Sequence, residues 1–589
     1  MRTNRKMEEK KMSMSKNIAR LAVTAGLTAA LSFGGVMAPV TMAFADDVAA
    51  PDNSITIKKV DDANKDNTFK AYQIFSAKVI DAQDGSGKIA SDVKWAVGGQ
   101  AQKDIIKAIR DSKGYSDSKS QLPTEDPITA QDVADWLSAN VTTTTASANG
   151  AKGTRVAPDD VLYSIAKAVI NNETAVGNSF KAGDSWTCSN DGYYLFVSDG
   201  LTDTTKPNTG TSPIFAIVGG NPVVVTEKTS IPTVNKEVRE GTKWGNVSDS
   251  YIGEEVEYKL TGSVADNIAT FNKYQYEFHD TLSKGLEAAE GSGNTPKDLH
   301  VYIDNKGNQT EIVQDDNDGY KVVLERDSAT KKENLTIAFT DLKTVKDKTG
   351  KTIKVDADSK VVVTYKATLT SDAEYTAAGN TNEVKLVYSN DPMSNGTGTS
   401  ESKKVADYVF GFDVTKIDPD NSSAKLDAGF TVKMIKEGSD KSVEKWLKQD
   451  GSFSNEVNDA YTFETTEAGN KVSIPGLVAG TYLISESKTP AGYNTIADFE
   501  ITVAPEYNTD GTLKELKVTS NSSMATPTTG GNVTTTKIPV TIQNKKGSGL
   551  PLTGLNGVTF TWIAGGAVLC IGVAHLIRSR KQAEESEQE

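Results

Sequence analysis

Two stretches of the sequence carry a lysine, an acidic residue and an asparagine in the same order. The two sets are Lys236, Asp280 and Asn382, and then Lys416, Glu486 and Asn544. Each residue lies on or at the end of an apolar segment with strand-like content, which predicts that β-strands place it in an interior. Burial lowers the pKa of a lysine and raises that of a carboxyl group. Such a pair can supply a neutral amine nucleophile and an acid for proton transfer.

The alternative is that each lysine and asparagine is a solvated residue at the end of a strand. For an isolated lysine this is the better interpretation. The same order of three residue types occurs twice, with the lysine on an opening strand, the asparagine on a closing strand and the acid between them. This repetition favours the buried arrangement, so we take both sets as candidate sites.

The strands that must position these residues follow from β-branched and aromatic content between Gly, Asn and Asp clusters. In residues 230–405 the expected strands are 256–260, 274–279, 301–303, 320–324, 335–339, 360–369 and 383–388, followed by a linker at 390–403. In residues 406–549 they are 412–416, 429–434, 471–474, 480–486, 499–504 and 538–544. Each region therefore reads as an antiparallel β-sandwich.

Residues 46–229 combine strand and helix patterns. Strands are expected at 55–57, 69–75, 192–197, 213–218 and 223–226, and helices at 101–111, 129–140 and 159–171. Thr129 and Asp132 have the spacing of a capping box. The predicted fold class is all-β, with tandem Ig-like sandwiches at 46–229, 230–405 and 406–549, the first with a helical insertion.

Composition excludes several classes of function. A chain of 589 residues is long enough for three or four domains. Its net charge of −14 argues against nucleic acid or an anionic membrane as a partner. Three His and two Cys are too few for most zinc, haem or iron–sulfur sites, so we expect no metal and no cofactor.

The two ends of the chain carry processing signals. Residues 1–45 have a basic stretch, an apolar run and Ala43-Phe44-Ala45, which is typical of a secretory signal cleaved after Ala45. Near the other end, an apolar span at about 558–577 precedes a basic cluster, which predicts a membrane-spanning segment with an internal tail. Removing both ends leaves Cys188 as the one cysteine, so no internal disulfide is possible in the exported chain.

Two motifs resemble those of a known family. Residues 482–493 read YLISESKTPAGY, which resembles the E-box of sortase-assembled pilins. The five residues before the apolar span, which resemble the LPXTG sorting signal of Gram-positive bacteria, are Leu550, Pro551, Leu552, Thr553 and Gly554. Residues 69–75, 192–195 and 252–258 also resemble segments of pilin domains. The chain is similar to the major, or backbone, pilins of Gram-positive bacteria, which are built from CnaB-type Ig-like domains.

The resemblance implies that each lysine forms an isopeptide bond with its asparagine, promoted by the acid. The expected bonds are Lys236–Asn382, with Asp280 as the acid, and Lys416–Asn544, with Glu486 as the acid. Asn390 is an alternative partner for Lys236, because it also ends the closing strand. For the first region, Lys58 and Lys59 lie on the opening strand, but no matching acid and asparagine can be identified.

The resemblance also implies covalent assembly at the cell surface. A sortase of class C type would cut between Thr553 and Gly554 and join Thr553 to a lysine of the next subunit. Lys228, in the segment VVVTEK at 223–228, is the candidate acceptor, although Thr226 and Glu227 stand where the family motif VYPK has Tyr and Pro.

The implied partners are identical subunits, minor pilins, a housekeeping sortase for anchoring and the peptidoglycan of the cell wall, and a host ligand is left open. The alternatives are a minor or tip pilin acting as an adhesin, and a surface protein or enzyme anchored to the wall without polymerisation. No clustered catalytic motif supports the enzyme.

Overall fold

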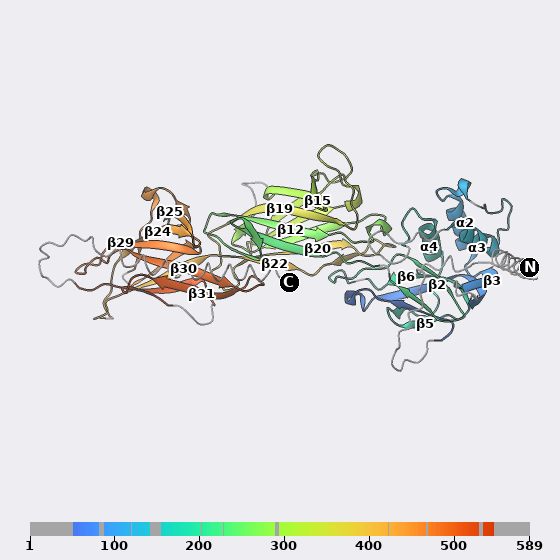
Figure 1. Cartoon of the computed structure of the whole chain (residues 1–589), viewed down its shortest axis with the longest axis horizontal. Coiled ribbons are helices and arrows are strands. Elements are labelled where there is room, and N and C mark those ends of the chain that lie inside the picture. Colours follow the sequence, from blue (N-terminus) through green and yellow to red (C-terminus); the bar gives the residue numbers. More distant parts are fainter. Residues whose placement is uncertain are drawn as a thin grey trace, which may run out of the picture.

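The structure, a computed structural model, describes residues 51–546 except for 82–87, 119, 142–154, 202, 228, 289–293, 422, 467–468 and 529–533. Three modules lie in a row along the longest axis of the molecule (Figure 1). We call them the N-terminal module (strands β1–β8), the middle module (β9–β22) and the C-terminal module (β23–β33). The predicted all-β fold class is confirmed, and the described α-helices all belong to the N-terminal module. No helix within these described residues is long and apolar enough to cross a membrane.

The N-terminal module contains two sheets. The smaller sheet has the order β5 (Ser185–Thr187), β1 (Ser54–Lys58), β8 (Val223–Thr226). The larger sheet has the order β3 (Lys88–Trp95), β2 (Thr68–Asp81), β6 (Gly192–Asp199), β7 (Ile214–Val218), with β4 (Phe180–Lys181) beside β2. Strands β1 and β8 run parallel, so the segment that enters this module lies next to the one that leaves it.

Three α-helices cover one side of the N-terminal module (Figure 1). They are α2 (Gly99–Arg110), α3 (Ala130–Asn140) and α4 (Val161–Asn172). Their buried residues recur at helical spacing, as with Ile105 and Ile109 on α2, and pack against β2, β6 and β7 in one core. The capping box of Thr129 and Asp132 is present. The three helices expected from the sequence are therefore confirmed.

The middle module is a sandwich of two seven-stranded sheets. One sheet has the order β10 (Lys243–Gly245), β9 (Val234–Glu240), β12 (Glu255–Ser263), β19 (Ser359–Leu369), β15 (Lys297–Asn305), β16 (Asn308–Glu311), with β14 (Leu286–Glu287) beside β19. The other has the order β11 (Val247–Asp249), β22 (Lys403–Tyr408), β20 (Asn380–Ser389), β13 (Tyr276–Leu282), β18 (Glu333–Phe339), β17 (Lys321–Arg326), with β21 (Thr397–Thr399) beside β20. Alternate residues of the central strands are buried between the sheets, as the period of two in a strand requires.

The C-terminal module is a second sandwich, of four and seven strands. The smaller sheet has the order β28 (Lys471–Leu477), β23 (Phe410–Ile417), β33 (Lys537–Gln543), β32 (Ala525–Pro527). The larger has the order β26 (Phe453–Ser454), β25 (Lys441–Leu447), β24 (Gly429–Glu437), β29 (Gly480–Lys488), β30 (Phe499–Tyr507), β31 (Leu513–Ser520), with β27 (Phe463–Glu464) beside β24. The opening strand β23 and the closing strand β33 are parallel neighbours.

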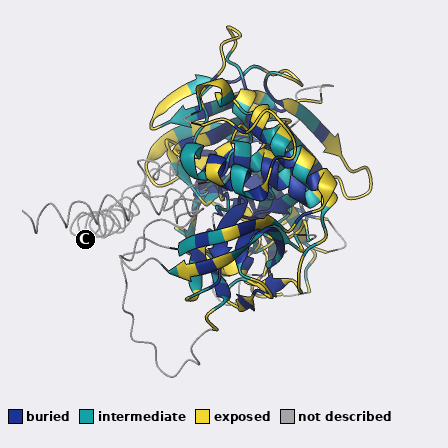
Figure 2. Ribbon diagram, turned by 90° about the vertical axis from the view of Figure 1, so that its right-hand side faces the viewer, coloured by how far each residue is buried: buried dark blue, intermediate teal, exposed yellow. Residues whose placement is uncertain are grey.

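Short 3-10 helices complete the described secondary structure, at Asp62–Asn64, Tyr115–Asp117, Ile268–Thr270, Leu342–Thr344 and Val457–Asp459. Seen along the long axis from the N-terminal side, the buried residues lie mostly on the strands and on the inner sides of the helices. The exposed residues lie mostly on the outside (Figure 2). The middle and C-terminal modules, which carry the two candidate sites, each have a buried apolar core of their own.

Side chains and backbone groups also join neighbouring modules. Asp249 on β11 accepts a hydrogen bond from the backbone N–H of Ala479, and the Gly476 N–H donates to the Tyr375 hydroxyl (2.8 and 2.9 Å). Between the first two modules, Arg155 forms an ion pair with Asp266 (3.0 Å).

The predicted linker at 390–403 is wrong in part. Residues 397–399 form strand β21, and β22 begins at Lys403 and continues to Tyr408. These strands lie in the same sheet as β20, so the strand that carries Asn382 does not close the middle module. The Gly, Asn and Thr content of this segment indicates turns, but its backbone pairs with strand β20.

Candidate functional sites

The middle module brings Lys236, Asp280 and Asn382 together between its two sheets. Lys236 comes from β9 of one sheet, and Asp280 and Asn382 come from the adjacent strands β13 and β20 of the other. The Lys236 ammonium donates hydrogen bonds to both oxygens of the Asp280 carboxylate, each at 2.7 Å. Neither of these two side chains is exposed to solvent.

The apolar surroundings of Lys236 control its charge. Its Nζ lies 5.3 Å from the ring centre of Tyr258 and 5.7 Å from that of Tyr365. Burial lowers the pKa of Lys236 to about 8, although the charge and hydrogen bonds of Asp280 act in the opposite direction. A lysine with this pKa loses its proton far more readily than one in water, and the neighbouring carboxylate can accept that proton.

Tyr365 is the member of this site that the sequence did not indicate. It lies on β19, and its hydroxyl donates to Asp280 Oδ2 at 2.6 Å while it accepts from Asn382 Nδ2 at 2.7 Å. The Lys236 Nζ lies 3.5 Å from the hydroxyl oxygen of Tyr365. A strand was expected at 360–369, and the period of two places Tyr365 inward with Val363 and Ala367. A buried tyrosine usually needs a partner for its hydroxyl, and this was the one signal available.

The geometry favours Asn382 over Asn390 as the partner of Lys236. On β13, Leu282 pairs with Asn382, whereas Tyr276, at the other end of the strand, pairs with Tyr388. Asn390 therefore follows the far end of β20. It is buried against the N-terminal module, where its Nδ2 donates to Asn208 Oδ1 at 2.9 Å and its backbone oxygen accepts from the Thr209 hydroxyl at 3.0 Å. Asn390 thus holds two modules together at some distance from Asp280.

The C-terminal module brings Lys416, Glu486 and Asn544 together in a different geometry. Lys416 is the second-last residue of β23 and Asn544 follows the parallel strand β33, so both come from the same sheet. Glu486 reaches across from β29 of the opposite sheet. The Lys416 Nζ lies 3.0 Å from Glu486 Oε1 and donates to Asn544 Oδ1. The side chains of Lys416 and Glu486 are fully buried.

Here the acid contacts the asparagine directly. Asn544 Nδ2 donates to both oxygens of Glu486, at 3.0 and 3.1 Å, and to the backbone oxygen of Asn494 at 3.0 Å. Burial lowers the pKa of Lys416, against the opposing hydrogen bond and charge of Glu486, and the Phe430 ring lies 5.3 Å from its Nζ.

The segment at 482–493 closes over this site. The Tyr482 hydroxyl donates to the backbone oxygen of Val478 at 2.7 Å, which fixes the start of the strand that carries Glu486. The turn that follows has Gly492 at φ +84°, a conformation that favours glycine. After it, the Tyr493 hydroxyl donates to Asp418 Oδ2 at 2.8 Å, just past Lys416. The motif therefore supplies the acid and ties its strand to the ends of β23 and β33.

Both sites can support the same chemistry. In each, a buried lysine with a lowered pKa contacts a buried carboxylate. The carboxamide nitrogen of the asparagine is hydrogen-bonded to that carboxylate directly in the C-terminal module, and through the Tyr365 hydroxyl in the middle module. This arrangement allows the lysine to pass its proton to the acid, the amine to approach the carboxamide, and the acid to protonate the leaving nitrogen.

Other predicted residues lie apart from these sites. Lys58 and Lys59 are exposed on and after β1, and no lysine of the N-terminal module is buried among the residues that the structure describes. Lys228, Leu550, Pro551, Leu552, Thr553 and Gly554 lie outside the described residues, as do the signal segment and the expected membrane span.

Cys188 is buried in the core of the N-terminal module, and burial raises the pKa of its thiol to about 11. A thiol with this pKa stays protonated at neutral pH and is a poor nucleophile. Within the described part of the chain, no group of three or more His, Cys, Asp or Glu side chains is arranged to hold a metal ion.

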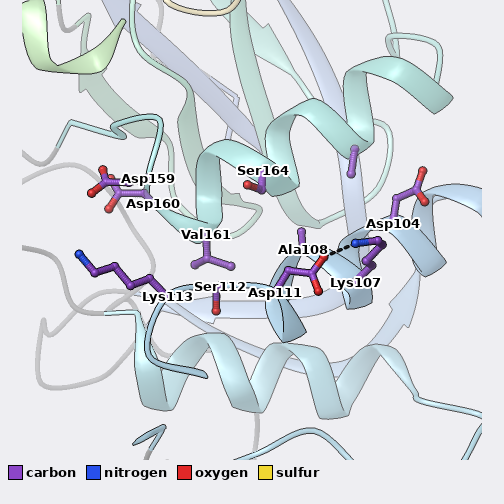
Figure 3. A pocket seen from close by; sticks show the side chains of 11 residues that line it. Asp104, Lys107, Ala108, Asp111, Ser112, Lys113, Asp159, Asp160, Val161 and Ser164 are labelled. Atoms are coloured by element: carbon purple, nitrogen blue, oxygen red, sulfur yellow. Dashed lines mark hydrogen bonds and ion pairs between the residues drawn. The ribbon is translucent and has the colours of Figure 1, made fainter. Parts of the chain in front are cut away.

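A hollow of about 490 Å³ lies between α2 and α4 of the N-terminal module (Figure 3). Its lining includes Asp104, Asp111, Asp159 and Asp160, and Lys107 pairs with Asp111 along one helix. The hollow is open to the surface. It contains neither a nucleophile paired with a base nor an unpartnered buried group directed into it, so we assign it no function.

Comparison with known protein families identifies the C-terminal module. Residues 411–522 match the SpaA family model, described as a prealbumin-like fold domain. This range includes Lys416 and Glu486 and ends before Asn544. The match places the motif at 482–493 within a prealbumin-like fold domain. Among curated proteins, no match is found.

Backbone pilins are among the solved structures that this chain resembles. The T6 backbone pilin of serotype M6 Streptococcus pyogenes is 15% identical, with 85% of this chain and 100% of that chain covered and a TM-score of 0.42. The major pilin SpaA of Corynebacterium diphtheriae is 14% identical, with 84% and 100% covered and a TM-score of 0.42. The pilus 2b backbone protein of group B streptococcus is 23% identical, with 54% and 99% covered and a TM-score of 0.38.

Proposed function

We propose that this chain is the structural backbone subunit of a covalently polymerised pilus on the surface of a Gram-positive bacterium. The observation that carries the proposal is the pair of buried lysine–acid–asparagine sets in successive modules of a row. The match of residues 411–522 to the SpaA family supports it. The role is structural rather than enzymatic, because the reaction at each site occurs once and its product is the protein itself.

In each site the lysine amine attacks the carboxamide carbon of the asparagine. The bond from Lys Nζ to Asn Cγ forms, the bond from Asn Cγ to Nδ2 breaks, and ammonia leaves. The proton released by the lysine passes through the acid to the leaving nitrogen, so the acid is regenerated. Folding supplies the proximity, because the strands hold the groups within hydrogen-bond range in a dry interior.

A second covalent bond would join one subunit to the next. A sortase of class C type would cleave after Thr553 and transfer its carbonyl group to Lys228, which directly follows the buried Glu227 where the chain passes from the N-terminal to the middle module. Repeating this head-to-tail bond gives an open filament instead of a closed oligomer. A housekeeping sortase would attach the final subunit to peptidoglycan, and minor pilins would be further partners.

Replacing Lys228 with Ala tests the role as a backbone subunit. We expect the ladder of high-mass species in cell-wall extracts to disappear, because the acceptor amine for Thr553 is lost. The measurement is an immunoblot of wall extracts under denaturing conditions. Lys243→Ala is the matched control, since Lys243 is an exposed lysine on β10, and it should leave the ladder intact.

A ladder that persists in the Lys228→Ala strain would contradict the assignment of Lys228. A wild-type strain in which the chain occurs only as a single wall-linked species would instead support a surface protein that does not polymerise. A chain found only once per fibre, at its end, would support a tip adhesin.

A further inference from the structure

The proposed isopeptide chemistry leaves one polar group of the middle site without a role, the hydroxyl of Tyr365. We propose that Tyr365 is a catalytic residue of this site, and that its hydroxyl relays a proton from Asp280 to the leaving nitrogen of Asn382. This inference rests on the proposed function, since it concerns the formation of the Lys236–Asn382 bond. It adds a fourth member to the lysine, acid and asparagine of the middle module.

The position of the hydroxyl supports this role. Its oxygen accepts from Asn382 Nδ2 at 2.7 Å, and its proton is donated to Asp280 Oδ2 at 2.6 Å. Tyr365 is the residue that links the acid to the leaving group, because no direct hydrogen bond joins Asp280 and Asn382 among the described contacts. The Asn382 Oδ1 has no partner within the described residues, so the carboxamide is held through the nitrogen that must leave.

The C-terminal site shows why the middle site needs this group. There, Glu486 contacts the carboxamide nitrogen of Asn544 directly with both of its oxygens. Asp280 is shorter than Glu486 by one methylene group, and both of its oxygens are engaged by Lys236. The phenol of Tyr365 bridges the gap that the shorter acid leaves. We therefore interpret the Asp280–Tyr365 pair of the middle module and the single Glu486 of the C-terminal module as two ways to bring a proton to the leaving nitrogen of the asparagine.

The proton transfer balances in the following way. Lys236 gives a proton to Asp280 and attacks Asn382 Cγ as a neutral amine. As the bond from Cγ to Nδ2 breaks, the Tyr365 hydroxyl proton passes to Nδ2 and the Asp280 proton passes to the Tyr365 oxygen. The amine proton lost when the new amide forms also passes to the departing nitrogen, which leaves as ammonium, and Tyr365 and Asp280 end as they began. Burial raises the pKa of Tyr365 well above its usual value, so the phenol carries its proton at neutral pH.

The neighbouring Tyr258 offers a matched control. Its ring stacks on that of Tyr365 with centres 5.5 Å apart, and both residues are fully buried. The Tyr258 hydroxyl, however, has no hydrogen-bond partner within the described residues. Tyr365→Phe and Tyr258→Phe each delete one buried hydroxyl from the same aromatic pair, but the first removes the proposed relay and the second does not.

The test follows formation of both bonds during synthesis of the full chain. Cell-free translation is stopped at intervals by denaturation, and the two crosslinked peptides are quantified by mass spectrometry. In Tyr365→Phe we expect the Lys236–Asn382 peptide to form at least about tenfold more slowly than in the wild type, since general acid catalysis contributes about 100-fold or more. The Lys416–Asn544 peptide should form at the wild-type rate, as should both peptides in Tyr258→Phe.

A second variant separates catalysis from structural support. In Tyr365→Phe combined with Asp280→Glu, the longer acid can reach Asn382 as Glu486 reaches Asn544, so we expect the rate to recover. A wild-type rate in Tyr365→Phe, an equal loss in Tyr258→Phe, or no recovery with Asp280→Glu would overturn the relay. A wild-type chain without the Lys236–Asn382 peptide at any time would overturn the proposed chemistry of the middle site itself.

Discussion

Pulled from its two ends, the C-terminal module should not lengthen. The force enters through β23 and leaves after β33, and the expected Lys416–Asn544 bond joins these two strands near the point of exit. The 128 positions between the bonded residues are then outside the path of the force. In Glu486→Ala the bond should not form, and the same module should extend by about 440 Å at about 3.4 Å per residue. Single-molecule force spectroscopy on the module between marker domains measures the difference.

The middle module should respond differently to force. Asn382 lies on β20, and the chain continues through β21 and β22 before it leaves the module. With the Lys236–Asn382 bond in place, the segment from Asn382 to the end of β22 can still be pulled out, by about 90 Å at about 3.4 Å per residue. The control for Glu486→Ala in the C-terminal module is Glu456→Ala, which removes an exposed acid of the same module. The C-terminal module of this variant should not extend. An extension of hundreds of ångströms in the wild-type C-terminal module would contradict this account.

Loss of the Lys416–Asn544 bond should lower the stability of the C-terminal module strongly. In Asn544→Ala the bond cannot form, but the Lys416–Glu486 ion pair remains. Releasing a loop of 128 positions should cost about 5 kcal/mol in the loop-entropy model. Glu486→Ala should cost about 3–5 kcal/mol more, because it also leaves Lys416 buried without its partner.

Calorimetry of the full chain measures this order of stabilities. We expect the transition of the C-terminal module to fall by about 10–20 °C in Asn544→Ala, and by more in Glu486→Ala. The transition of the middle module should stay in place, which makes it an internal reference. Equal transition temperatures in the wild type and Asn544→Ala would show that no bond constrains the wild-type chain.

The parts of the structure that local pattern controls could be predicted from the sequence. The helices around Ile105, Val133 and Ile165 follow from apolar spacing, and the sandwiches follow from short strands between turn residues. Lys236 and Lys416 stood out because each is followed by an acid and an asparagine in the same order, and the structure shows both lysines buried.

Contacts between distant strands could not be predicted in this way. Tyr365 looked like one more inward aromatic residue, because its role depends on Asp280 and Asn382 in the facing sheet. Asn390 stayed an alternative to Asn382 in the sequence, since only the register of β20 on β13 shows which asparagine faces the lysine. The strands β21 and β22 were missed because a chain rich in Gly, Asn and Thr pairs there with a sheet edge that the sequence does not reveal.

The intact mass of residues 46–549, purified in the native state, tests the central claim most directly. Each isopeptide bond releases one ammonia, so the chain should be lighter than its sequence by two ammonia molecules. Replacing Glu486 with Ala should restore one of them. Peptide mapping should then find Lys236 joined to Asn382 and Lys416 joined to Asn544. A native chain with its full sequence mass, from which both lysines are recovered with free side chains, would contradict the account.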